Sequence, residues 1–192
     1  MFNIDTGSGG SEGPWLAWSA RGTQDGSVPA RSFFIRDDKG KRPIDCFDRG
    51  VVLDIYAMKT GWQKSEGMAG VAPEWKWNAN VSRFEPQPGD DYKRGFTIPC
   101  AISQTEKATW EQAGAAVWNA LTRLAPKLQD APEGKLPVIK ITGTNAVQFK
   151  RGSTVEPILE IVKWVDRPAA LKDGAAAGID TGATAQPAPQ PA

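Results

Sequence analysis

Hydrophobic and polar residues alternate over several short stretches of the chain, and this period of two predicts β-strands. The alternation is clearest over residues 137–143 and 157–165, and a flexible hairpin connection is expected between them over 144–156. Shorter runs rich in aromatic or β-branched residues predict further strands at 14–19, 32–36, 74–78 and 95–100.

Turn and breaker residues set the expected limits of these strands. Asp37-Asp38-Lys39-Gly40 favours a tight turn after the strand at 32–36. Pro99 is expected to end the strand at 95–100, because proline cannot donate to a strand ladder. The apolar run 51–58 suits a buried strand, and its length leaves a helix as the alternative.

Residues 105 to about 127 instead repeat their apolar side chains at helical spacing. Thr105 and Glu106 are suitable residues to begin a helix, and Pro126 is expected to end it. The stripe consists of Trp110, Gly114, Val117, Trp118, Leu121 and Leu124. We therefore predict a mainly β fold, a small OB-like β-barrel with one inserted α-helix at about residues 105–125.

The composition changes at both ends of the chain. Residues 1–13 are rich in Gly and Ser and predict a flexible N-terminal arm, whereas residues 169–192 are rich in Ala, Pro and Gln and predict a disordered tail. One folded domain is expected over 14–168. The N-terminus lacks the features of a secretory signal and no stretch is apolar enough to span a membrane, so we expect a cytoplasmic protein with reduced cysteines.

The residue types present exclude most catalytic chemistry. The chain has no His, which removes Ser-His-Asp and Cys-His triads, and its 2 Cys cannot form a four-thiolate zinc site. The Asp pairs at 37–38 and 90–91 lie beside Gly, a context that favours turns over paired acid–base chemistry. We expect no enzymatic activity, no metal and no cofactor. A hydrolase that uses carboxylates alone is the one enzyme class left open.

Tryptophan is strongly enriched, with 8 Trp against 2 Tyr in 192 residues, and basic residues are interleaved with the aromatic ones although the net charge is only +1. Single-stranded nucleic acid is held by such sets, because bases stack on rings while Lys and Arg contact the phosphates. The expected stacking residues are Trp62 in a polar loop, Trp75 and Trp77 on one face of a short strand, and Phe96. The expected phosphate contacts are Arg31, Arg36, Lys59, Lys64, Lys76, Lys93, Arg94, Lys150 and Arg151.

The other tryptophans have less distinctive positions. Trp110 and Trp118 belong to the helical stripe and are assigned to the core. Trp15, Trp18 and Trp164 are left open between the core and a binding site.

The C-terminal part resembles the closing hairpin of phage-type single-stranded DNA-binding proteins. The resemblance lies in Leu136-Pro137-Val138-Ile139-Lys140-Ile141-Thr142-Gly143, a Lys-Arg-Gly-Ser connection, and the segment Pro157 to Pro168 with its Trp-Val-Asp-Arg-Pro end. It implies an OB-fold that coats single-stranded DNA without strong sequence preference, in phage DNA replication or recombination inside a bacterial cell. A homo-oligomer and replication or recombination proteins as partners are compatible with such a function. The tail departs from the acidic tail of many single-strand binders, since it holds only Asp173 and Asp180, offset by Lys172.

Two other classes of binding protein fit the same composition. One is a structural or virion accessory protein with a β-sandwich body, in which the aromatic residues form the core and subunit contacts and no nucleic acid is bound. The other is a carbohydrate-binding module, against which the absence of a secretory signal counts.

Overall fold

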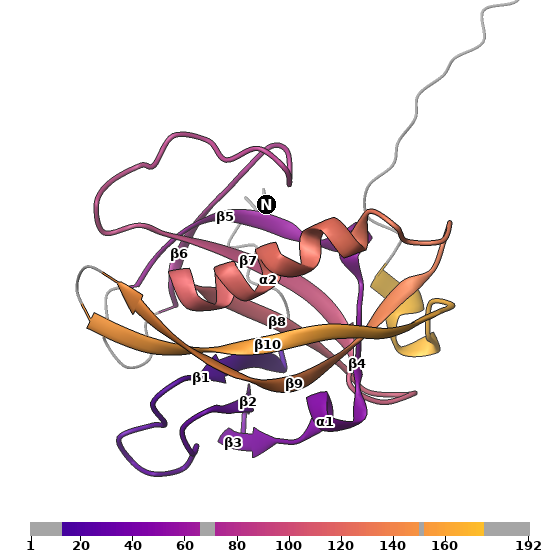
Figure 1. The fold of residues 1–192 in the computed structure, drawn as a ribbon, viewed down its shortest axis with the longest axis horizontal. Helices are drawn as coiled ribbons and strands as arrows, with labels where there is room; N and C mark the ends of the chain where they lie inside the picture. Colours follow the sequence, from indigo (N-terminus) through magenta and orange to yellow (C-terminus); the bar gives the residue numbers. More distant parts are fainter. Residues whose placement is uncertain (1–12, 66–71, 150–151, 175–192) are drawn as a thin grey trace, which may run out of the picture.

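The computed structural model describes residues 13–65, 72–149 and 152–174. Strands dominate these residues, so the predicted mainly β fold with an inserted helix is confirmed (Figure 1). The strands are β1 (Trp15–Ser19), β2 (Ser32–Asp37), β3 (Gly40–Ile44), β4 (Val51–Leu53), β5 (Lys59–Lys64), β6 (Glu74–Trp77), β7 (Lys93–Ala101), β8 (Lys107–Ala113), β9 (Leu136–Phe149) and β10 (Gly152–Val165).

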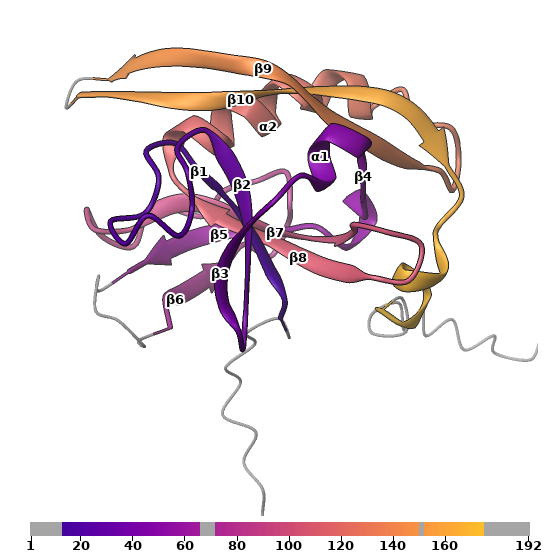
Figure 2. The same ribbon diagram turned by 90° about the horizontal axis from the view of Figure 1, so that it is seen from below.

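All ten strands belong to one sheet with the order β10-β9-β4-β7-β8-β1-β2-β3, and β5 joins β6 to β7. The pairs are antiparallel except that of β1 with β8, which is parallel. The sheet is curved (Figure 2). No ladder joins β3 to β10 among the described strands, so the sheet is open and does not close into the expected barrel. The predicted turn at residues 37–40 is confirmed, since it connects β2 to β3.

The core lies on one face of the sheet and includes a cluster of aromatic rings among its aliphatic side chains. Trp110 on β8 is fully buried, and its ring meets those of Phe33, Phe47 and Phe96 edge-on at 5.3, 5.6 and 5.1 Å between centroids. Such edge-to-face pairs add to the stabilisation from area burial, by about 0.5–1.5 kcal/mol each. The expectation that Trp110 is a core residue is confirmed, although it lies on a strand.

The inserted helix is shorter than predicted and begins later. Residues 107–113 form strand β8, and helix α2 (Ala115–Leu128) starts only after Gly114, whose φ of 121° favours glycine. The helical pattern was misleading because Trp110 on β8 and the buried residues of α2 contact the same core, so their spacing in the sequence resembles one helical stripe. Pro126 does not end the helix but lies in its last turn, where a missing N–H removes a single hydrogen bond.

The hairpin of β9 and β10 is much longer than predicted. Residues 144–149 and 152–156, expected in a flexible connection, are strand residues that continue the antiparallel ladder. Lys150 and Arg151 lie outside the described residues. Helix α2 runs beside β10 in both views (Figures 1 and 2), and its Arg123 pairs with the fully buried Glu156 of β10. This contact covers an edge strand that would otherwise be open to pairing.

The segment 45–58 is neither one strand nor one helix. It forms the short helix α1 (Cys46–Arg49), strand β4 and the 3₁₀ turn η1 (Ile55–Ala57). Pro99 likewise does not end its strand, since β7 continues through it in register with β8.

Packing also continues beyond Pro168, where the predicted tail begins. Residues Ala169–Gly174 form the 3₁₀ helix η2, and its Leu171 is buried against Ala101 and Leu136. Arg167 Nη2 donates to Asp54 Oδ1 at 2.9 Å. The Trp-Val-Asp-Arg-Pro segment therefore attaches the C-terminal part of the chain to the segment between β4 and η1. The rest of the predicted tail and the predicted arm, except Gly13, lie outside the described residues.

Both cysteines are free and buried, as expected for structural thiols. Burial raises the pKa of Cys46 to about 12 and raises that of Cys100 as well, so neither is an activated nucleophile.

Candidate functional site

Trp75 and Trp77 lie on the same face of β6, as the alternation predicted. Their rings are parallel, with centroids 4.3 Å apart and an interplanar angle of 9°. Both residues are half-buried, and each ring covers one face of the other. The neighbouring strands have glycine at the paired positions: Trp77 pairs with Gly61 of β5, and Gly61 pairs with Gly95 of β7. The absence of side chains there lets two indoles lie close to the sheet.

The strand register extends this surface across the sheet, since directly paired residues project to the same side. We call this side the outer face, and it is opposite the core. It is formed by alternate residues of neighbouring strands: Trp15, Phe34, Arg36, Lys41, Lys59, Gly61, Gln63, Trp75, Trp77, Lys93, Gly95, Thr97, Thr109, Glu111 and Ala113.

A second aromatic group lies further along the outer face. The guanidinium carbon of Arg36 is 5.0 Å from the ring centroid of half-buried Trp15. The parallel pairing of β1 with β8 places Trp15 beside Thr109, two residues from Glu111. Glu111 thus lies between the Trp75–Trp77 pair and the Trp15–Arg36 pair.

The charge of the outer face is mostly positive. Arg36, Lys41, Lys59 and Lys93 are all exposed, and Glu111 is the one acid that the described residues place on this face. Burial raises the pKa of Glu111, while the indole N–H of Trp75 and the positive charge of Arg36 oppose that rise. The outer face therefore combines flat rings with a surplus of cations, although the whole chain is nearly neutral.

Trp62 and Phe96 do not belong to this surface. Trp62 lies in strand β5 rather than in a polar loop, is 7% exposed, and donates its indole N–H to the carbonyl of Glu85 at 2.9 Å. Phe96 is 1% exposed and packs against Trp110. Both side chains point to the side opposite Trp75 and Trp77, because even and odd positions of a strand face opposite ways. The four stacking residues expected from the sequence are thus divided between two faces.

The expected phosphate-contacting residues are divided in the same way. Arg36, Lys59 and Lys93 lie on the outer face. On the opposite side, Arg94 lies over the rings of Trp62 and Phe84 at 5.6 and 5.0 Å. Lys64 forms an ion pair with Asp91 at 2.8 Å. The remaining positions are also dispersed. Lys76 Nζ lies 4.9 Å from the ring centroid of Tyr92. Arg31 is in an exposed loop with φ of 58°, and Lys150 and Arg151 are outside the described residues.

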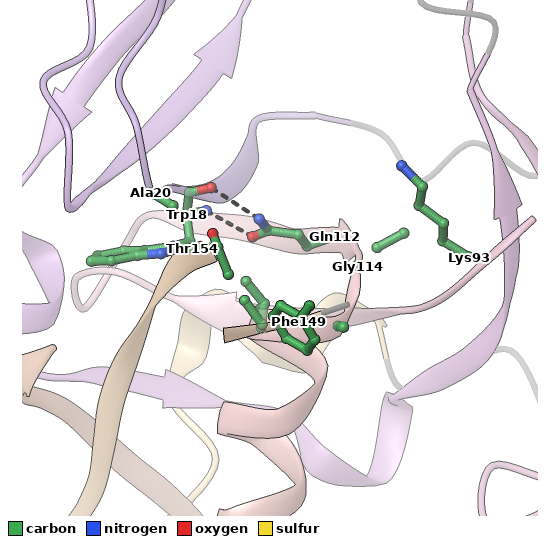
Figure 3. Close-up of a pocket in the computed structure, with 11 residues that line it drawn as sticks. Trp18, Ala20, Lys93, Gln112, Gly114, Phe149 and Thr154 are labelled. Carbon is green, nitrogen blue, oxygen red and sulfur yellow. Dashed lines mark hydrogen bonds between the residues drawn. The ribbon is translucent and has the colours of Figure 1, made fainter. Parts of the chain in front are cut away.

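A pocket of about 740 Å³ lies between the start of α2 and the β9–β10 hairpin (Figure 3). Its amide side chain, Gln112, is already engaged: Trp18 N donates to Gln112 Oε1 at 2.7 Å, and Gln112 Nε2 donates to Trp18 O at 2.9 Å. Most of the remaining lining is apolar, including Val117 and Phe149, and the Lys93 side chain points away from these residues. The outer face offers more groups able to bind a ligand than this pocket does.

The described part of the chain also bears on two further classes of site, metal centres and membrane spans. No group of three or more His, Cys, Asp or Glu residues there is placed to hold a metal ion. Nor does any described helix have the length and apolar character needed to cross a bilayer.

Comparison with protein-family models, with curated proteins and with solved structures finds no significant match to this chain.

The sequence does not identify most members of the outer face as site residues. Among those that matter for binding, it leaves Trp15 open between the core and a site, and it gives no reason to select Lys41 or Glu111. A sequence signal existed only for Trp15, whose run 14–19 alternates. Lys41 and Glu111 join the face through the pairing of β3 with β2 and of β8 with β7.

Proposed function

We propose that the protein binds single-stranded DNA on the outer face of its sheet. The observation that carries the proposal is the stacked Trp75–Trp77 pair on a face that also presents four exposed cations. Stacking of a base on an aromatic ring contributes about 1–3 kcal/mol and depends little on the identity of the base. Lys and Arg residues that contact phosphates add a term that weakens as salt is raised.

The residues proposed to contact the strand are a revised set. Trp75 and Trp77 stack with bases from one end of the face, and Trp15 supports a second base beside Arg36. Lys59 and Lys93 flank the Trp75–Trp77 pair, on strands β5 and β7, and contact the phosphates. Trp62 and Phe96 stabilise the strands beneath and do not contact DNA, because their rings are buried on the other side.

The biological setting is also part of the proposal. The resemblance of the C-terminal hairpin supports a role in phage DNA replication or recombination, in the cytoplasm of a bacterial host. Binding to the outer face requires no enzymatic step.

A structural or virion accessory protein is the second candidate. Ile158 and Val162 of β10 support it, because these β-branched side chains are 41% and 45% exposed and suit contact with another protein. This candidate predicts a defined oligomer that does not respond to oligonucleotides.

A fluorescence titration with a 20-nucleotide oligo-dT, at low and at physiological salt, separates the two. Single-strand binding predicts saturable quenching of Trp emission that weakens as salt rises, and much weaker binding of a duplex of equal length. The absence of any change at micromolar protein, together with a stable oligomer in light scattering, would favour the accessory protein.

A further inference from the structure

Glu111 is an unexpected residue on a surface that binds phosphates. It is half-buried in the middle of the outer face, where a carboxylate repels a nucleic-acid backbone. Its neighbours on this face are Trp75 on one side and the Trp15–Arg36 pair on the other. A charged group in this position needs a binding partner that offers hydrogen-bond donors.

The described side chains leave the carboxylate with free acceptor capacity. A carboxylate has about four lone-pair sites for donors. Arg36 is oriented over the ring of Trp15 and does not approach Glu111 within ion-pair distance among the ion pairs of the described residues. Trp75 Nε1 faces the acid but makes no hydrogen bond of regular geometry, so it occupies at most one of these acceptor sites.

The place of Glu111 next to the ring pair decides which part of a nucleotide it meets. Because each ring covers one face of the other, a base stacks on the free side of the Trp75–Trp77 pair and lies parallel to the rings, so its edge, and not its phosphate, points sideways in the plane of the rings. Unpaired bases in single strands are commonly hydrogen-bonded on their Watson–Crick edge. The donor pattern of that edge therefore determines the fit to a carboxylate.

Guanine is the base whose Watson–Crick edge has two adjacent donors, N1–H and the N2 amino group. Adenine and cytosine present one amino donor beside an acceptor nitrogen, and thymine presents one N–H between two carbonyls. We propose that Glu111 makes the outer face prefer guanine, with its two carboxylate oxygens accepting from N1–H and N2–H of a base stacked on the Trp75–Trp77 pair. This inference rests on the proposed single-strand binding, and it adds one selective position to an otherwise sequence-tolerant surface.

The test compares four 12-nucleotide oligo-dT strands that carry dT, dG, dA or deoxyinosine at one central position. Each is labelled with fluorescein, and binding is followed by anisotropy at physiological salt. Deoxyinosine keeps N1–H and lacks the N2 amino group, so it isolates the second hydrogen bond. We expect the dG strand to bind about 10-fold more tightly than the dT strand, the scale of one good bidentate contact, and deoxyinosine to lose most of that gain.

Glu111→Gln is the matching variant, because it keeps the shape of the side chain and replaces one acceptor oxygen with a donor. In this variant we expect the preference for dG to disappear, while the dT strand binds as well as before or more tightly. Equal affinities of the dG, dA and deoxyinosine strands for the wild-type protein would overturn the inference while leaving single-strand binding intact. Failure of all four strands to bind would overturn the proposed function itself, and the inference with it. The comparison of strands on the wild-type protein needs no variant to fold.

Discussion

The indole of Trp75 lies against Gly95 of strand β7, and a Cβ atom added to Gly95 would be 2.7 Å from Trp75 Cη2. The same atom would also be 2.8 Å from the Cβ of Ala113 and from the carbonyl oxygen of Gln112. Two of these three contacts involve the rigid strand β8. The position of the Trp75–Trp77 pair thus depends on the absence of a side chain at residue 95.

Gly95→Ala should therefore destabilise the fold by about 1–3 kcal/mol, the usual cost of forcing extra atoms into a packed site. It should also displace Trp75 and weaken oligonucleotide binding. Urea unfolding followed by circular dichroism measures the first effect. Gly143→Ala on β9 is the matched control, because its Cβ would meet only the end of Ile158 at 3.5 Å, and it should be close to neutral. Equal midpoints for the two variants would contradict this account.

Gln112 extends the hydrogen bonding of β8 toward β1 with its side chain instead of its backbone. It accepts from Trp18 N and donates to Trp18 O, and Trp18 is a buried residue. Gln112→Ala leaves these two main-chain groups without partners and should cost about 1–3 kcal/mol of unfolding free energy. Gln104→Ala, in an exposed loop, should change the urea midpoint little. A neutral Gln112→Ala would show that water replaces the amide without loss.

The pH dependence of stability should report on Glu111. Burial raises its folded-state pKa above the ordinary value of 4.5, so the folded protein holds this proton more tightly than the unfolded chain does. Ionisation consequently destabilises the fold as pH rises from 4.5 through the folded-state pKa. We expect Glu111→Gln to be more stable than the wild-type protein at pH 7, and the difference to shrink toward pH 4. Thermal unfolding of both proteins across this range isolates the effect, because the other carboxyl groups are common to both. A pH-independent difference would refute it.

The sequence predicted those features that depend on local alternation. The shared face of Trp75 and Trp77 follows from their spacing of two residues in an extended strand, and the β9–β10 pairing follows from two long alternating runs. The same rule would have placed Trp62 and Gly61 on opposite sides, had residues 59–64 been recognised as a strand, but that Gly61 shares the side of Trp77 depends on the pairing of β5 with β6.

The rest of the outer face depends on pairings between distant segments. The parallel pairing of Trp15 with Thr109 joins residues that are far apart in the chain, and no local pattern encodes it. The helix boundary failed for a related reason. Trp110 and Val117 both contact the core, one from a strand and one from a helix, and their spacing imitates a single helical stripe.

Arg167 is expected to be essential for the C-terminal end of the fold. Asp54 is 3% exposed and is paired by this guanidinium, which also holds the segment leading to η2. Arg167→Ala leaves a buried carboxylate without its cation and should cost about 3–5 kcal/mol. Lys172→Ala, an exposed neighbour, should cost little in the same urea experiment. Adding Asp54→Asn to Arg167→Ala should restore part of the loss, and a further loss in the double variant would contradict the electrostatic explanation.

The central claim is that single-stranded DNA binds the outer face, and an anisotropy titration of labelled oligo-dT with matched variants tests it most directly. Trp77→Ala and Lys93→Ala each remove one proposed contact, whereas Trp164→Ala on β10 and Lys127→Ala on α2 remove the same residue types elsewhere. We predict that Trp77→Ala raises the Kd by about 5- to 100-fold, as loss of one stacking ring requires, and that Lys93→Ala lowers the salt dependence. The two controls should bind like the wild-type protein. Unchanged binding by Trp77→Ala and Lys93→Ala, with loss of binding in the controls, would place the DNA elsewhere and contradict the account.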